Sequence, residues 1–144
     1  MFHYPINFSF KIKDLDSSNL IVLDSNQFNV SADIPVEFNG QGRALSPEDY
    51  YMFSLVTCFF TTFLKLSSQK NIDFKIKNIG CVSVLDRGED SKPFVKNVTL
   101  NFDFSSNSSV DFKRLVDFTK DNCFILNSVK TNFIIDINEI HESI

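Results

Sequence analysis

Residues 46–68, SPEDYYMFSLVTCFFTTFLKLSS, are the stretch that decides the fold, because they carry the strongest helix signal in the chain. Ser46 can cap the helix, Pro47 suits its first position, and Asp49 completes the spacing of a capping box. The apolar run within it, residues 50–66, is interrupted by serine, threonine and lysine and is shorter than the ~20 residues that span a bilayer. We therefore predict a long buried helix here.

Strands are predicted on both sides of this helix, because apolar and polar residues alternate there. The expected strands are residues 6–12, 20–23, 28–34, 72–85 (bulged or broken near Gly80), 94–104 and 133–137. Between the last two, the polar run SSNSS precedes a second helix whose apolar face carries Phe112, Leu115, Val116 and Thr119. Strands come in runs rather than in strict alternation with helices. This order favours a single α+β domain over residues 1–144, with a mostly antiparallel sheet.

Composition and charge limit the classes of partner. The chain has 144 residues, 43% of them hydrophobic and 22% charged, which is the balance of a globular protein. Its net charge is −4, and its 14 basic residues are scattered along the chain. Without a basic cluster, neither nucleic acid nor an anionic membrane surface is an expected partner.

The three cysteines are expected to be thiols in a reducing compartment. The start of the chain, MFHYPINFSFKIK, lacks the basic and apolar regions of a signal peptide. We therefore expect a cytoplasmic protein without structural disulfides. The two histidines stand near opposite termini, and no metal motif or glycine-rich phosphate loop is present. No cofactor or metal is expected.

Two cysteines lie 65 positions apart in apolar, helix-like surroundings: Cys58 in the long helix and Cys123 at or just after the end of the second helix. A thiolate can attack a peroxide, and a second thiol can trap the oxidised product. A buried cysteine can equally be an inert core residue that packs like a small hydrophobe. From the residues alone, both interpretations stay open for each of the two.

Three segments stand out as motifs: EFNGQG at 37–42, SPED at 46–49 with Cys58 ten positions after Glu48, and DNCFILNSV around Cys123. Together they resemble the OsmC/Ohr family, which includes organic hydroperoxide reductases. The order of elements and the cysteine spacing also fit, so the resemblance covers nearly the whole chain. Cys81 matches no residue of the family, and we interpret it as structural.

The resemblance implies a fold, an activity and partners. The fold would be an intertwined homodimer with long central helices at the interface. Cys58 would reduce an organic hydroperoxide and then form a disulfide with Cys123. Dithiols, such as proteins that carry dihydrolipoamide, would reduce that disulfide.

The resemblance also implies roles for an acid and an arginine. Glu48 matches the acid that holds an arginine against the reactive thiol, although an unbroken helix would separate Glu48 from Cys58 by about 15 Å. The first 42 residues contain no arginine, so Arg43 is the candidate for the activating cation. Arg43 supplies the charge that lowers the pKa of Cys58, or it is a solvated loop residue.

Two other functions stay open beside the peroxidase. The chain could form a non-catalytic dimer of the same fold that binds small apolar ligands. It could also be a redox sensor that acts through a partner protein.

Overall fold

The computed structural model describes residues 11–12, 21–24 and 29–144. The chain divides into two compact units, residues 1–50 and residues 51–144. That the two units together form the single domain expected for residues 1–144 stays a prediction.

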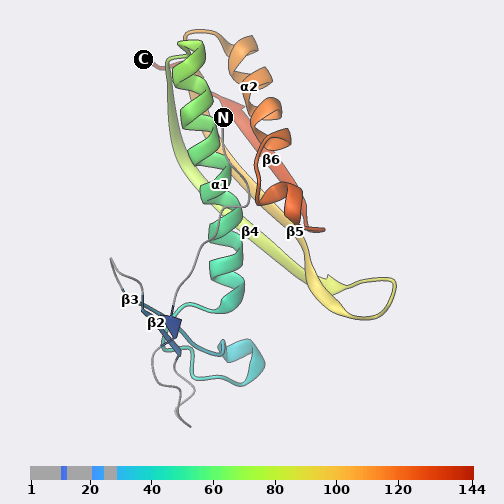
Figure 1. Cartoon of the computed structure of the whole chain (residues 1–144). Coiled ribbons are helices and arrows are strands. Elements are labelled where there is room, and N and C mark those ends of the chain that lie inside the picture. The colour runs from blue at the N-terminus through green and yellow to red at the C-terminus, as the bar shows by residue number, and fades with distance from the viewer. Residues whose placement is uncertain (1–10, 13–20, 25–28) are drawn as a thin grey trace, which may run out of the picture. The chain divides into compact units, whose positions relative to one another are not determined.

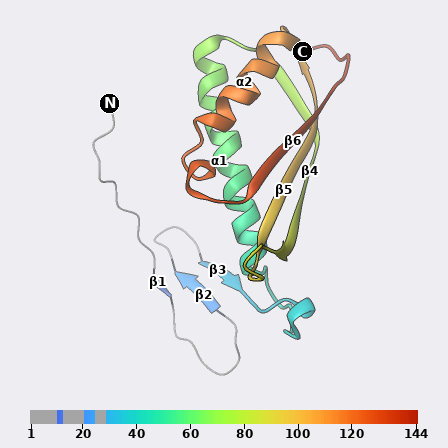
Figure 2. The same cartoon turned by 90° about the vertical axis from the view of Figure 1, so that its right-hand side faces the viewer.

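The first unit contains a small antiparallel sheet in the order β1-β2-β3 (Figures 1 and 2; β1 is labelled in Figure 2). Its strands are β1 (Lys11–Ile12), β2 (Ile21–Asp24) and β3 (Asn29–Ala32). The strands expected over 20–23 and 28–34 are therefore confirmed, the second in a shorter form. Most of the strand expected over 6–12 lies outside the described residues. β3 ends at Ala32 because the next residue, Asp33, accepts a hydrogen bond from the backbone of Ile34 and draws the chain out of the ladder.

A tight loop follows β3 and leads to the long helix. It holds the short 3-10 helix η1 (Val36–Phe38), and the hydrogen bond from the Asp33 N–H to the Leu45 carbonyl, 3.1 Å, closes it. Both of its glycines are required. A Cβ at Gly40 would lie 1.9 Å from the Ile34 carbonyl oxygen, and Gly42 has a φ of +63°.

The long helix, α1 (Pro47–Lys70), confirms the helix predicted from residues 46–68. Its capping box is complete: the Ser46 N–H donates to the Asp49 carboxylate at 2.8 Å, and the Asp49 N–H donates to the Ser46 hydroxyl at 3.1 Å. At the other end, Asn71 takes a left-handed φ of 52°, and the Ile72 N–H bonds back to the Ser67 carbonyl at 3.1 Å. This pattern satisfies the last carbonyls and stops the helix.

The second unit is a three-stranded sheet covered on one face by two helices (Figures 1 and 2). Its strands are β4 (Phe74–Arg87), β5 (Pro93–Ser106) and β6 (Asn132–Glu139), and α2 (Ser109–Asp121) and η2 (Leu126–Ser128) connect the last two. β4 and β5 pair in antiparallel fashion. β5 and β6 are parallel, because α2 carries the chain back to the end of the sheet at which β5 begins. The α+β class is confirmed.

An irregularity predicted in β4 is also present. The register of β4 against β5 shifts between Lys77 and Gly80, and Asn78 has a φ of 51°. The break predicted near Gly80 is thus a β-bulge, which lets one long strand bend along its neighbour.

The core of the second unit consists largely of phenylalanine rings. Phe112 is stacked on Phe104, with ring centroids 4.1 Å apart, and makes a T-shaped contact with Phe63, with ring centroids 5.2 Å apart. The predicted apolar face of α2 is confirmed, since its four members are all buried. The buried cluster contains Leu55, Phe59, Phe63, Val98, Leu100, Phe102, Phe104, Phe112, Leu115, Val116 and Phe133. These contacts fix α1 and α2 on the sheet and thereby position the residues in the middle of α1 and those that follow α2.

Candidate active site

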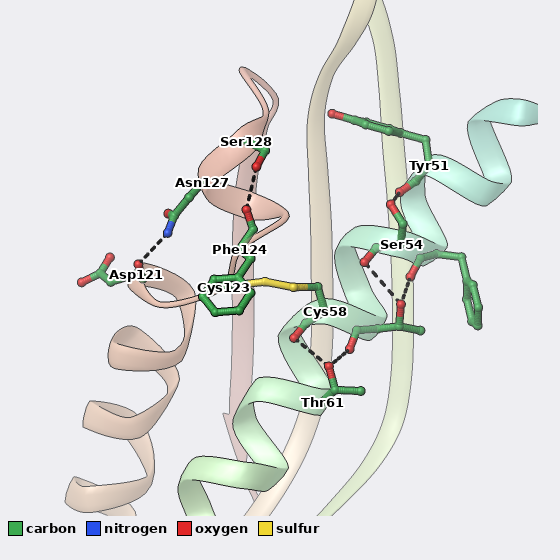
Figure 3. The surroundings of a disulfide bond; sticks show 11 residues. Tyr51, Ser54, Cys58, Thr61, Asp121, Cys123, Phe124, Asn127 and Ser128 are labelled. Carbon is green, nitrogen blue, oxygen red and sulfur yellow. Dashed lines mark hydrogen bonds between the residues drawn. A yellow bond between two sulfur atoms is a disulfide. The ribbon is translucent and has the colours of Figure 1, made fainter. Parts of the chain in front are cut away.

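Cys58 and Cys123 meet on the helical side of the second unit and are joined as a disulfide (Figure 3). Cys58 stands in the middle of α1, and Cys123 follows the end of α2. Their Cα atoms are 6.2 Å apart, within the usual range for a disulfide, although 65 positions separate them in the sequence. The packing of α1 and α2 on the sheet therefore brings together the two cysteines that the sequence singled out.

The part of α1 around Cys58 stays helical although it is rich in serine and threonine. The Ser54 hydroxyl donates to the Tyr51 carbonyl at 2.8 Å. The Thr61 hydroxyl donates to the carbonyls of Thr57 at 2.8 Å and Cys58 at 3.2 Å (Figure 3). These side chains satisfy their hydrogen-bonding capacity on their own helix, so Cys58 is held at a fixed position on an ordered turn.

Cys123 lies in the short connection between α2 and β6 and is fully buried. Its carbonyl accepts the Asn127 N–H at 3.0 Å, and the Asn127 side chain donates to the Asp121 carbonyl at 3.1 Å. The next residue, Phe124, is 66% exposed. The Cys123 sulfur is thus enclosed, whereas the aromatic ring of the following residue is accessible to solvent.

Cys81 has a different environment. It lies on β4 as a free thiol and packs against the phenylalanine core. Burial raises the pKa of the Cys81 thiol above its ordinary value. A raised pKa lowers the share of the nucleophilic thiolate at Cys81.

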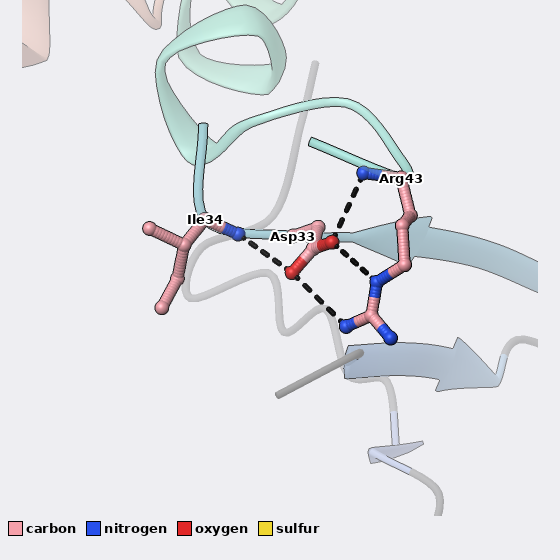
Figure 4. A network of polar contacts seen from close by, with 3 residues as sticks. All are labelled: Asp33, Ile34 and Arg43. Atoms are coloured by element: carbon pink, nitrogen blue, oxygen red, sulfur yellow. Dashed lines mark hydrogen bonds and ion pairs between the residues drawn. The ribbon is translucent and has the colours of Figure 1, made fainter. Parts of the chain in front are cut away.

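Arg43 is bound to a buried carboxylate in the first unit (Figure 4). Its Nε donates to Asp33 Oδ2 at 2.8 Å, and its backbone N–H donates to the same oxygen at 3.0 Å. The Asp33 side chain is only 1% exposed. The hydrogen bonds from the Arg43 side chain and backbone lower the pKa of Asp33 from 3.8 to about 2. The guanidinium therefore stabilises the loop between β3 and α1, and its expected action on Cys58 stays a prediction.

Glu48 occupies the first turn of α1, as the sequence predicts. Within the described residues, one of its carboxylate oxygens, Oε2, is buried and has no hydrogen-bond partner. Glu48 also lines a cavity of about 190 Å³ in the first unit, together with Ala32, Asp33, Ile34, Pro35, Phe38 and Pro47. Its expected role in orienting an arginine beside Cys58 stays a prediction.

The second unit has two arginines. Arg87 donates to the Ser91 carbonyl at 2.8 Å in the turn between β4 and β5. Arg114, on α2, lines a surface hollow with Lys70 and Phe118. That a cation activates Cys58 stays a prediction.

In the described part of the chain, no three His, Cys, Asp or Glu side chains form a group that could hold a metal ion. Over the same residues, no helix is long and apolar enough to cross a membrane.

Sequence reasoning missed three polar residues. Asp33 is the buried partner of Arg43, ten positions away, and nothing in the alternating pattern of the strand before it marks that pairing. Tyr51 and Thr131 share a hydrogen bond over 80 positions in the sequence. Both pairings depend on the folded chain, so no local signal in the sequence reveals them.

Solved structures from several bacteria have a similar fold. A protein of Psychrobacter arcticus, assigned to osmotic stress and detoxification, matches with a TM-score of 0.76 at 18% identity, over 95% of this chain and 100% of that one. The organic hydroperoxide resistance protein OsmC of Legionella pneumophila matches with a TM-score of 0.69 at 14% identity, over 94% and 98%. OhrB, the organic hydroperoxide resistance protein of Bacillus subtilis, matches with a TM-score of 0.64 at 16% identity, over 92% and 98%.

At these identities the likeness shows the fold alone. No curated protein matches the sequence. The sequence itself, however, matches the family model for the OsmC-like protein over residues 40–138, which includes both bonded cysteines. The chain therefore belongs to the OsmC-like family, as its sequence motifs indicate.

Proposed function

We propose that the protein is a cofactor-free thiol peroxidase that reduces organic hydroperoxides. The observation that carries the proposal is the bond between Cys58 and Cys123, two residues on different helical segments. The names of two proteins of similar fold, from L. pneumophila and B. subtilis, refer to organic hydroperoxide resistance. The raised pKa of Cys81 favours the other two cysteines as the reactive pair.

The proposed cycle has three balanced steps. The Cys58 thiolate attacks the terminal peroxide oxygen, the O–O bond breaks, and the alkoxide leaves as an alcohol after taking up a proton. Cys58 is then a sulfenic acid. The Cys123 thiol attacks its sulfur, so a disulfide forms and water leaves. A dithiol, for example dihydrolipoamide on a carrier protein, reduces the disulfide by exchange and becomes a disulfide itself.

Activation of Cys58 requires a nearby positive charge. In mid-helix, the sulfur gains little from the helix dipole, whose effect fades within a turn. We assign this role to Arg43 and the role of orienting it to Glu48. The working protein is proposed to be a homodimer, so the first unit of either copy can supply the two residues.

The decisive experiment is turnover of cumene hydroperoxide with dihydrolipoamide as the reductant. Cys58→Ser should abolish turnover, because its hydroxyl cannot replace a thiolate. The matched control is Cys81→Ser, which removes the third thiol and should keep the rate of the unchanged protein. Undiminished turnover by Cys58→Ser would end the proposal.

A second candidate function is a non-catalytic dimer that binds small apolar ligands. One observation favours it: the guanidinium of Arg43 is already bonded to Asp33. The pH dependence of Cys58 alkylation by iodoacetamide, in a Cys81→Ser/Cys123→Ser background, separates the two candidates. A thiol pKa well below the ordinary value of about 8.5 supports the peroxidase, and a value near 8.5 supports the binding protein.

A further inference from the structure

A relay of hydroxyl groups connects α1 to the chain that follows Cys123. Tyr51 Oη and Thr131 Oγ1 share a hydrogen bond, and Thr131 Oγ1 also donates to the Val95 carbonyl at 2.7 Å. A threonine hydroxyl has one hydrogen, which goes to Val95, so Tyr51 is the donor in the first contact. The relay thus joins three elements of the second unit: α1, the residues before β6, and β5.

The relay fixes one end of the segment that carries Cys123, here defined as residues 122–131. Thr131, at its far end, is buried. The near end is fixed to α2, where the Asn122 side chain donates to the Phe118 carbonyl at 2.8 Å. Cys123 is therefore held in a segment that is anchored on both sides, and the anchors do not involve sulfur.

The relay and the disulfide start from the same side of α1. Tyr51 precedes Cys58 by seven residues, close to two helical turns, so the two side chains share a face about 10 Å apart along the axis. Figure 3 shows the side chains of Tyr51 and Cys58 extending from the same side of α1. The disulfide breaks when the protein is reduced, whereas the hydroxyl relay is independent of the redox state.

We infer that Tyr51 is a positioning residue for the disulfide-forming step. Through Thr131 it keeps Cys123 close to Cys58 in the reduced protein, so that the sulfenic acid meets a thiol before a second peroxide molecule. In that step the Cys123 sulfur bonds to the Cys58 sulfur, the S–O bond breaks, and the hydroxide leaves with the thiol proton as water. The effect of Tyr51 on the rate of disulfide formation after peroxide attack rests on the proposed function. Its effect on how readily the two thiols form a disulfide at equilibrium does not.

The test variant is Tyr51→Phe, which keeps the ring and removes the hydroxyl. Its matched control is Tyr50→Phe, since the neighbouring Tyr50 hydroxyl donates to the Ser31 carbonyl of the first unit and not to the Cys123 segment. All variants are made in a Cys81→Ser background. The first measurement is the equilibrium between the Cys58–Cys123 disulfide and glutathione, which reports the effective concentration of one thiol at the other. Tyr51→Phe should lower that effective concentration about fivefold, as expected for one lost hydrogen bond.

The second measurement separates the two chemical steps with cumene hydroperoxide in single turnover. Tyr51→Phe should slow disulfide formation about fivefold. It should also raise the yield of Cys58 sulfinic acid at high peroxide. The rate of sulfenic acid formation, followed in a Cys123→Ser background, should not change. A general loss of stability would alter both steps together and would not produce this division.

Two results would overturn the inference: an unchanged glutathione equilibrium in Tyr51→Phe, or an equal change in Tyr50→Phe. If Tyr51→Phe does not fold, Thr131→Val removes the same contact from the other side and takes its place in both measurements. Failure of the unchanged protein to react with peroxide would refute the proposed function instead. The glutathione equilibrium would still test the position of Cys123.

Discussion

Reduction of the disulfide between Cys58 and Cys123 should destabilise the protein by a predictable amount. The bond closes a loop with a sequence separation of 65 residues. For a loop of that length, the chain-entropy relation gives a loss of about 14 cal/mol/K in the unfolded chain, or about 4 kcal/mol at 25 °C. A catalytic disulfide must leave a folded protein behind when it opens, so this loss has to be smaller than the total stability.

Equilibrium unfolding in urea, followed by far-ultraviolet circular dichroism at one protein concentration, measures this difference. With a urea dependence of about 2 kcal/mol/M, the reduced protein should unfold at a midpoint roughly 2 M lower than the oxidised protein. The double variant Cys58→Ser/Cys123→Ser should match the reduced protein and be insensitive to reductant. Cys81→Ser should respond to reductant as the unchanged protein does.

Two outcomes would refute the reasoning. Equal midpoints for the oxidised and reduced proteins would mean that the two sulfurs are not bonded in solution. A reduced protein that is unfolded without urea would mean that the bond is structural, and the proposed catalytic cycle would then lack its starting state.

Three further predictions concern the core, the long helix and the ion pair. Phe112→Ala should lower the free energy of unfolding in urea by about 3–5 kcal/mol because the ring is fully buried, whereas truncation of the exposed Phe124 should cost less than about 1 kcal/mol; similar losses would contradict the packing described. Ser46→Ala should cost about 1 kcal/mol in the same assay through loss of the capping box, and no loss would mean that the cap does not form in solution. Because the pKa of Asp33 in the folded protein is about 2, below 3.8, its pair with Arg43 stabilises the fold above about pH 4, and that stabilisation is lost as the pH falls from 4 through 2. Thermal unfolding of Asp33→Asn should lack this part of the pH dependence, and a profile parallel to that of the unchanged protein would contradict it.

Local signals predict the elements of the fold well. The capping box at Ser46 and the N-cap at Ser108 both consist of hydrogen bonds between residues close in the sequence. Both helix starts can therefore be predicted from a few neighbouring residues. The bulge near Gly80 is also found, since a glycine in a strand marks a close approach: its Cβ would lie 2.4 Å from the Asn101 side-chain oxygen. Strand alternation does not determine direction, however. The parallel pairing of β5 with β6 follows from the crossover through α2.

The candidate site is predicted less completely. The partnership of Cys58 with Cys123 is expected from the family resemblance, not from the spacing, because loop length alone does not select a disulfide. The ion pair between Arg43 and Asp33 could not be predicted, since the two residues are ten positions apart and meet only when the loop between them closes. The relay from Tyr51 to Thr131 joins residues 80 positions apart and forms only when α1 packs beside β5 and β6.

The central claim is that Cys58 and Cys123 are a redox pair driven by peroxide. Its most direct test is a titration of the fully reduced protein, freed of reductant, with cumene hydroperoxide, followed by peptide mapping under non-reducing conditions. One equivalent of peroxide should consume two thiols and give one cross-linked peptide that joins Cys58 to Cys123, while Cys81 remains open to alkylation. Three thiols left intact, or a cross-link through Cys81, would contradict the account.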